Sequence, residues 1–239
     1  YINFLLGVLK KYKENHPYND IIPDILNKAI KMEKAILELI VDGFDTEAFS
    51  TWRTLHETEC ILSLLLKNGK KTIESYLVHM KYAMAFRGVI PNKEEVDAIF
   101  VEIKSKMQQL NLKSKDMKKF IEYGWLTSID GFFELENYKY NFRDGVERLA
   151  GLNHYSKTYE LASEIAHSSP LLIYSKSQYF YHATLINLME SFFRIEEMFL
   201  HFYKVSSSEE EFNRYLNMRQ VYIAQIKIIY KIETTIMKK

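Results

Sequence analysis

Helix-breaking residues are scarce in this sequence, and their scarcity most constrains what the chain can fold into. The 239 residues include only eight glycines and four prolines, and most of the long intervals between them have the apolar spacing of an α-helix. Continuous strand-like alternation is absent. We therefore predict an all-α multi-helix bundle with helices at residues 2–15, 20–41, 46–67, 70–87, 93–110, 114–124, 130–149, 153–168, 174–204 and 208–237.

Several predicted helix ends coincide with residues that favour them. Asp42-Gly43 and Asn68-Gly69 follow two of the apolar intervals, and Pro91 precedes another. Ser208 before Glu209, Glu210 and Glu211 is typical of a helix start, because a hydroxyl caps the first turn and acids favour its positive end.

The last two predicted helices are long and joined by a short turn, so residues 174–237 are expected to form an antiparallel helical hairpin. A chain of this length can bury a substantial core. We predict a single all-helical domain over residues 1–239, in which residues 1–44 could be an N-terminal elaboration.

Charge, apolar run length and cysteine content limit the kinds of partner and the location expected for this protein. The formal net charge is +1 and only seven residues are arginine, which argues against a dedicated nucleic-acid binder while leaving local contacts open. The apolar runs are shorter than the roughly 18 residues of a membrane span. Cys60 is the only cysteine, so a cytoplasmic location is predicted, and the sequence indicates no cofactor.

Two distant helical segments carry polar residues at one-turn spacing. In the first, Arg53 and Glu57 lie four residues apart beside an apolar stretch; in the second, Tyr159, Ser163 and His167 form one stripe. Charged groups on buried helices need partners, so the two stripes are predicted to meet in a small polar, ligand-binding site. The alternative is a structural ion pair between Arg53 and Glu57, with His167 favoured simply by its place at a helix end.

A metal site is a weaker possibility. Glu164 and His167 have the Glu-x-x-His spacing of carboxylate metal sites in helical bundles, and Glu57 could add a third ligand. A second Glu-x-x-His is absent, and about one such match is expected by chance.

An enzyme is a further alternative. Arg148 with His154, and Arg194 with His201, approximate the Arg-x₄₋₆-His spacing of HEPN-type ribonucleases, although chance placement gives about one match. A hydrolase or HEPN-like ribonuclease would use His167 as general base and Arg53 as anion clamp, with Glu57 also a catalytic candidate. Whether the protein is an enzyme stays open.

A resemblance rests on a longer pattern. It comprises Arg53-x-x-x-Glu57, Tyr123-Gly124-Trp125, Leu149-Ala150-Gly151-Leu152 and Tyr155-x-x-x-Tyr159-x-x-x-Ser163-x-x-x-His167-Ser168-Ser169. Over about residues 45–205 the chain resembles a bacterial all-helical family known only as domain of unknown function number 5677. The resemblance implies an all-α, cytoplasmic bacterial protein without an established activity, in which Arg53, Glu57, Ser163 and His167 recur together.

The leading hypothesis is therefore a ligand-binding or regulatory and stress-related helical-bundle protein. A third possibility is an oligomeric structural or interaction protein that forms a homodimer through residues 174–237, with Tyr222, Ile226, Ile229 and Tyr230 at the contact.

Overall fold

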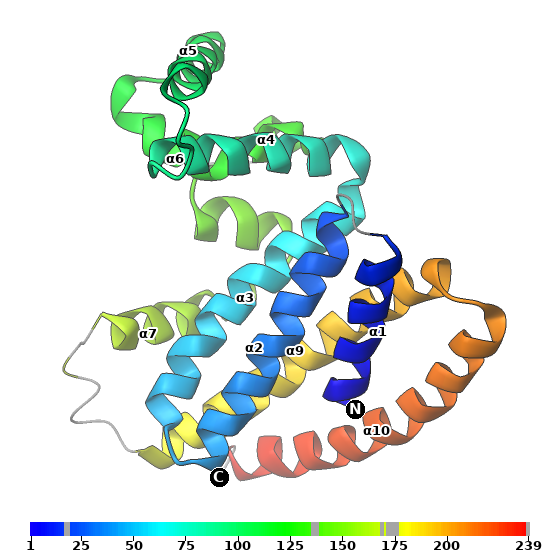
Figure 1. Cartoon of the computed structure of the whole chain (residues 1–239). Helices are drawn as coiled ribbons and strands as arrows, with labels where there is room; N and C mark the ends of the chain where they lie inside the picture. The colour runs from blue at the N-terminus through cyan, green and yellow to red at the C-terminus, as the bar shows by residue number, and fades with distance from the viewer. Residues whose placement is uncertain (17–19, 135–138, 168–169, 171–176, 238–239) are drawn as a thin grey trace. The chain divides into compact units, whose positions relative to one another are not determined.

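The computed structural model describes residues 1–16, 20–134, 139–167, 170 and 177–237, and it confirms the all-α prediction (Figure 1). No strand occurs in these ranges. The α-helices are α1 (Ile2–Asn15), α2 (Ile21–Val41), α3 (Asp45–Asn68), α4 (Lys70–Phe86), α5 (Lys93–Gln109), α6 (Met117–Tyr123), α7 (Ser156–Ala166), α9 (Ser177–Ser206) and α10 (Glu209–Ile236).

Helix caps explain several of these boundaries. The Asp20 side chain accepts a hydrogen bond from the backbone N–H of Ile22 at the start of α2. Ser208 and Glu211 form a reciprocal capping box at the start of α10, as the serine and glutamate run predicts. At α5 Asn92 is the N-cap, because its side chain accepts hydrogen bonds from two backbone N–H groups, and Pro91 precedes it.

The segment predicted as one helix over 130–149 has a different structure. It contains a 3₁₀ turn at Phe132–Glu134 and a π-helical segment at Phe142–Glu147, and residues 135–138 lie outside the described ranges. Gly145 lets the π-helical segment lie close to Lys139, since a Cβ atom there would be 2.6 Å from the Lys139 carbonyl oxygen. The apolar spacing of this segment reflects burial and does not indicate a continuous helix.

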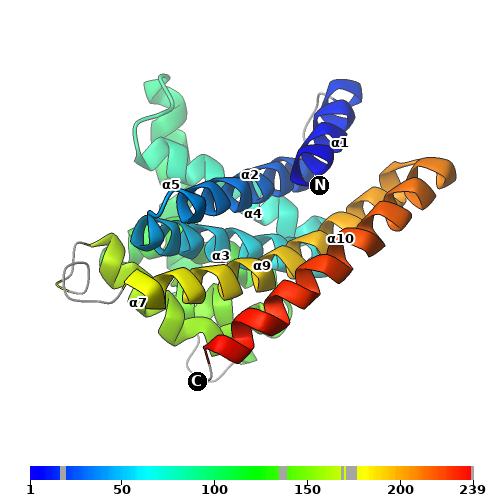
Figure 2. The same ribbon diagram turned by 90° about the horizontal axis from the view of Figure 1, so that it is seen from below.

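The chain folds into two compact units, residues 1–62 with 157–239 and residues 63–156. The first, called unit 1, contains α1, α2, most of α3, α7, α9 and α10. Helix α2 packs against α1 and α9, and α9 packs against α10 (Figure 2). The single domain over 1–239 stays a prediction.

Unit 1 has an aromatic and aliphatic core. Trp52 and Phe49 of α3 are fully buried, and Phe49 lies against Phe180 of α9 with ring centroids 5.4 Å apart. Hydrogen bonds between α9 and α10 join Glu190 to Tyr230 and His182 to Glu233, so the two helices run antiparallel.

The second unit, unit 2, has its own core beneath α4, α5 and α6. Helix α4 packs against both of the other helices and against the 3₁₀ segment Gly124–Ser128. Its buried core residues are Tyr82, Ala85, Ile99, Ile103, Met107, Phe120 and Ile121.

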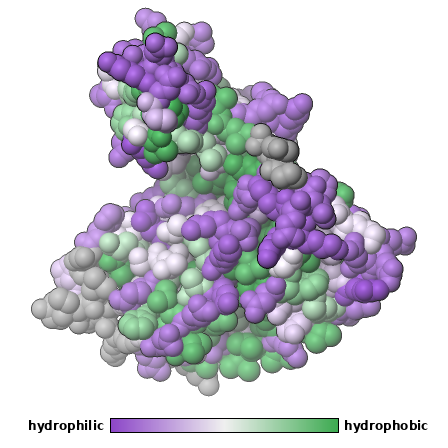
Figure 3. All heavy atoms as spheres, viewed as in Figure 1, coloured by the Kyte–Doolittle hydropathy of each residue, from purple (hydrophilic) through white to green (hydrophobic). Residues whose placement is uncertain are grey.

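Hydrophilic residues cover much of the molecular face in Figure 3, with hydrophobic patches between them. Among the described residues, no helix has the length and apolar character needed to cross a membrane.

Candidate functional site

Three side chains from α3 and α7 meet in one polar cluster, here called the Arg53 cluster: Arg53, Glu57 and Tyr159. The Tyr159 hydroxyl donates to Glu57 Oε1 at 2.6 Å, and Arg53 Nη2 lies 3.1 Å from the same oxygen. Arg53 Nη2 also donates to the Tyr159 hydroxyl oxygen at 3.2 Å, with the guanidinium carbon 5.1 Å from the ring centroid. Residues about 100 positions apart in sequence are thus joined by direct hydrogen bonds.

The Arg53 cluster combines a buried phenol with partly exposed charges. Tyr159 is 7% exposed, whereas the side chains of Arg53 and Glu57 are 27% and 32% exposed. Burial raises the pKa of Tyr159, and its hydrogen bond to the Glu57 carboxylate raises it further. Tyr159 therefore remains a neutral hydrogen-bond donor at physiological pH and is not a base.

A second, mostly buried polar group joins α3 to α9 and is here called the His56 network: His56, Glu59, Arg194, Ser191 and Trp52. His56 Nδ1 lies 2.7 Å from Glu59 Oε1, and both side chains are 0% exposed. Arg194 of α9 reaches the same carboxylate from the other side at 2.8 Å. Ser191 accepts hydrogen bonds from Trp52 Nε1 at 3.1 Å and from Arg194 Nη2 at 3.3 Å.

The two polar groups are adjacent. The His56 ring centroid lies 6.2 Å from that of Tyr159, and Trp52 stacks on His56 at 5.2 Å. Cys60 Sγ is 3.9 Å from His56 Nε2, but Cys60 is fully buried, so this thiol has no open approach for a substrate. The His56 network thus packs against Tyr159 on the buried side of the Arg53 cluster.

The remaining predicted site residues lie further along α7. Ser163 is half-buried one turn after Tyr159, and His167 is exposed just beyond the helix end. Eight residues of helix span about 12 Å, so His167 lies roughly that far along the axis from Tyr159. Within the described part of the chain, no hydrogen bond or ion pair joins the His167 side chain to Arg53 or Glu57. Ser168 and Ser169 of the same pattern lie outside the described residues.

The metal alternative named Glu57, Glu164 and His167. Glu164 is exposed on α7, and Glu57 is held by Arg53 and Tyr159. No group of three or more His, Cys, Asp or Glu side chains that could hold a metal ion is found among the residues the structure describes.

The two Arg–His pairs that approximate the ribonuclease spacing differ in their burial. Arg148 and His154 are both exposed at the surface of unit 2. Arg194 belongs to the His56 network, whereas His201 is exposed on the same helix. The Arg194 guanidinium is therefore committed to a buried carboxylate, which reduces its use as a phosphate clamp.

A third polar group, here called the Glu196 network, was not foreseen from sequence. The Glu196 carboxylate is fully buried and accepts hydrogen bonds from Tyr1 at 2.7 Å, from Arg219 Nε at 2.6 Å, and from Tyr215. Opposite charges recur on the last two helices, but only their antiparallel packing brings Arg219 to Glu196. Sequence spacing alone carried no signal for this contact.

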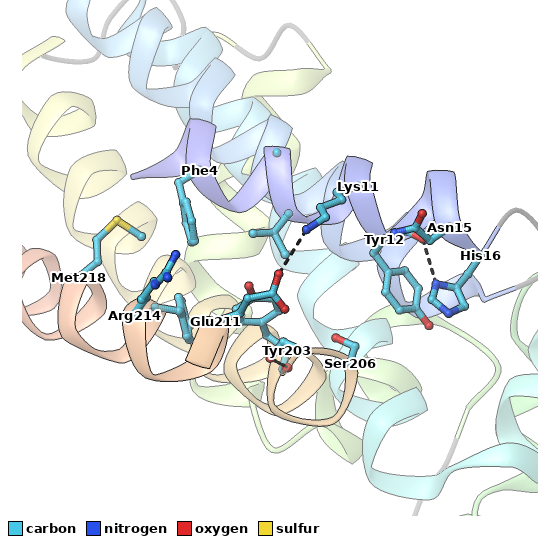
Figure 4. A pocket seen from close by; sticks show the side chains of 14 residues that line it. Phe4, Lys11, Tyr12, Asn15, His16, Tyr203, Ser206, Glu211, Arg214 and Met218 are labelled. Atoms are coloured by element: carbon cyan, nitrogen blue, oxygen red, sulfur yellow. Dashed lines mark hydrogen bonds and ion pairs between the residues drawn. The ribbon is translucent and has the colours of Figure 1, made fainter. Parts of the chain in front are cut away.

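A cavity of about 570 Å³ lies between α1 and the turn that joins α9 to α10 (Figure 4). Lys11 and Glu211 point toward each other across it and form an ion pair at 3.2 Å. Their side chains are 72% and 44% exposed, so this pair contributes little to stability or to the capture of a ligand. The Arg53 cluster, whose members come from two helices and are partly buried, is the better candidate site.

Together these features define an all-helical protein with a partly exposed Arg–Glu–Tyr cluster supported by a buried network. A family model described as "Family of unknown function (DUF5677)" matches residues 20–183, about two thirds of the chain, and the chain belongs to this family. The resemblance seen in the sequence is thereby confirmed, although the matched region begins and ends earlier than the predicted 45–205. No curated protein and no solved structure matches the chain.

Proposed function

We propose that this protein binds a small polar ligand at the Arg53 cluster. The observation that carries the proposal is a guanidinium and a carboxylate that are held side by side and are still 27% and 32% exposed. Such a pair complements a ligand that has both an anionic and a cationic group, because each charge of the ligand meets its opposite. A zwitterion such as a free amino acid is the ligand class that fits best.

Preorganisation supports the same proposal. Tyr159 hydrogen-bonds to both charged partners and is itself buried, and the His56 network lies behind it. Side chains already fixed in position lose less conformational entropy when a ligand binds. Ser163, one turn further along α7, would be the next polar group beside a bound ligand, followed by His167 at the helix end. A regulatory or stress-related role would follow from such binding.

The test uses three matched sets of compounds: free amino acids, the amines that lack their carboxylates, and the acids that lack their amino groups. Binding is measured by calorimetry for the native protein, for Arg53→Ala and for Glu57→Gln. We expect at least one amino acid to bind tenfold or more tightly than its matched amine and acid. Each substitution should weaken that binding at least tenfold.

Arg214→Ala provides a matched control, because Arg214 also pairs with a glutamate four residues away but on a solvated face. This variant should bind as the native protein does. If no amino acid binds, or if Arg53→Ala and Arg214→Ala behave alike, the Arg53 cluster is a structural ion pair and the proposal is wrong.

The hydrolase or ribonuclease alternative requires His167 to act on a substrate held by Arg53. The exposed position of His167 beyond α7 gives it no orienting partner among the described residues, and a general base needs one. Incubation with labelled RNA and generic phosphoesters, repeated with His167→Ala, decides this point. Loss of a native activity in His167→Ala would favour the enzyme hypothesis over the binding one.

A further inference from the structure

A mostly apolar cavity of about 440 Å³ lies within unit 1, away from the Arg53 cluster. Helices α1, α2, α9 and α10 all contribute to its lining. Leu188, Phe192, Ile226 and Ile229 are among the apolar side chains, and Glu33 of α2 is the acidic residue of the lining. The volume and the apolar walls are those of a small-molecule site.

Glu33 is the unusual member of this lining. It is 1% exposed, and neither carboxylate oxygen has a hydrogen-bond partner among the described residues. Buried polar groups in proteins are nearly always hydrogen-bonded, and a buried carboxyl without a partner destabilises the fold. A residue that destabilises the bundle in this way calls for a functional explanation.

Glu33 differs from the other buried glutamates of unit 1 in having no cationic partner among the described residues. Glu59 and Glu196 are also fully buried in unit 1, and each is paired with an arginine, Arg194 and Arg219 respectively. No such cation pairs with Glu33 in the described part of the chain. Burial and the two neighbouring carboxylates all raise its pKa well above the usual value.

Lys34 is the basic side chain in the cavity lining, but it pairs with Glu38 and not with Glu33. It forms an ion pair with Glu38 at 3.7 Å, and the two side chains are 45% and 65% exposed. The long Lys34 side chain thus lies toward solvent, while the neighbouring Glu33 is directed into the bundle.

We propose that this cavity binds an amphiphilic amine, whose apolar chain contacts the leucine, isoleucine and phenylalanine walls and whose ammonium group pairs with Glu33. The ammonium would supply the third cation for three buried carboxylates. Glu33 lines the cavity with its carboxylate oxygens buried, so binding requires a change of side-chain rotamer that presents the carboxylate to the ligand. Pairing with the ammonium favours the ionised form of Glu33.

Three ligands with the same chain and different head groups test the proposal: octylamine, octanol and octanoate. Calorimetry with the native protein should show octylamine binding at least tenfold more tightly than the other two. Glu33→Gln should lose that preference, because an amide keeps the shape but not the charge. Ile229→Trp should weaken all three ligands by filling the cavity.

Two further variants serve as controls. Asp24→Asn removes an exposed carboxylate from the same helix, outside the cavity lining, and should leave octylamine binding unchanged. Glu33→Leu should retain or raise the melting temperature while abolishing the amine preference, since it removes an unpartnered buried group. Arg53→Ala should not affect octylamine, which separates this proposal from the amino-acid site.

Equal binding of the three ligands would show an apolar cavity in which Glu33 has no role, and the proposal would be wrong. Octylamine binding that persists in Glu33→Gln, or the absence of any octylamine binding, would overturn it equally.

Discussion

Glu57 and Glu59 lie two positions apart on α3, and their surroundings differ. The Glu57 side chain is 32% exposed and shares Arg53 and Tyr159, whereas Glu59 is fully buried between His56 and Arg194. At the scale of single residues, exposure decides what each carboxylate contributes, because solvent screens the first and not the second.

The two alanine substitutions should therefore differ in size. We expect Glu59→Ala to lower the free energy of unfolding by about 3 kcal/mol or more, because it leaves the buried His56 and the partly buried Arg194 without their shared carboxylate. Glu57→Ala should cost about 1 kcal/mol, as a partly solvated pair does. Urea denaturation of both variants measures the difference, and equal losses would contradict this assignment of burial.

His79 of α4 is a second residue whose burial can be measured. The imidazole is 6% exposed and hydrogen-bonds to the Ile121 carbonyl at 3.2 Å, and burial lowers its pKa to about 4. The unfolded chain takes up this proton near pH 6.5 and the folded chain only near pH 4. Stability due to neutral His79 is complete above pH 6.5 and is lost as the pH falls toward 4.

From pH 7 to pH 5 this difference should cost the native protein about 2 kcal/mol. His79→Gln, which can still donate to the Ile121 carbonyl, should lack that part of the pH dependence. Denaturant unfolding at the two pH values gives both slopes. If the free energy of unfolding changes equally with pH in the native protein and the variant, burial does not lower the pKa of His79.

At the scale of secondary-structure elements, two glycines occupy contrasting positions. Gly124 ends α6 where a Cβ atom would lie 2.4 Å from His79 Cε1 and 2.6 Å from the Phe120 ring, and both of those side chains are buried. Gly7 lies inside α1, and a Cβ atom there would meet nothing within 4 Å. The first glycine allows α6 to approach α4 closely, and the second has no such role.

Alanine at the two positions should change stability in opposite directions. Gly124→Ala should destabilise the protein by about 1–3 kcal/mol through overpacking against His79 and Phe120. Gly7→Ala should stabilise it by about 0.5–1 kcal/mol, because alanine loses less backbone entropy in a helix. Thermal unfolding of both variants tests the pair, and a neutral Gly124→Ala would show that α6 can move away from α4.

At the scale of the whole molecule, the all-helical fold class and the Arg53–Glu57 part of the site could be predicted from the sequence. Few glycines and prolines with helical periodicity are local signals, and so is the four-residue step from Arg53 to Glu57. The partner of Glu59 is Arg194, 135 positions away, and only tertiary packing selects it. The prediction of one helix over residues 130–149 is wrong because burial gives the same apolar spacing.

The division into two compact units leads to a prediction for the whole chain. If each unit opens by itself, Gly124→Ala should accelerate amide hydrogen exchange in α4, α5 and α6. Exchange in α2, α9 and α10 should keep its native rate. Acceleration of similar size throughout would show one cooperative unit, in agreement with the single domain predicted from sequence.

The predicted homodimer through residues 174–237 also concerns the whole chain and stays a prediction. Two of its four proposed contact residues, Ile226 and Ile229, line the cavity beside Glu33, and the Tyr230 hydroxyl donates to Glu190. Residues 174–176 of that segment lie outside the described ranges.

The pairing of Glu59 with Arg194 has a consequence for how this family is delimited. The family match ends at residue 183, so it contains the buried carboxylate and stops before the arginine that neutralises it. A polypeptide trimmed to residues 20–183 would keep Glu59 and His56 but lose Arg194 and most of α9. Autonomous folding of this chain should therefore require α9 as well as the residues that the family model matches.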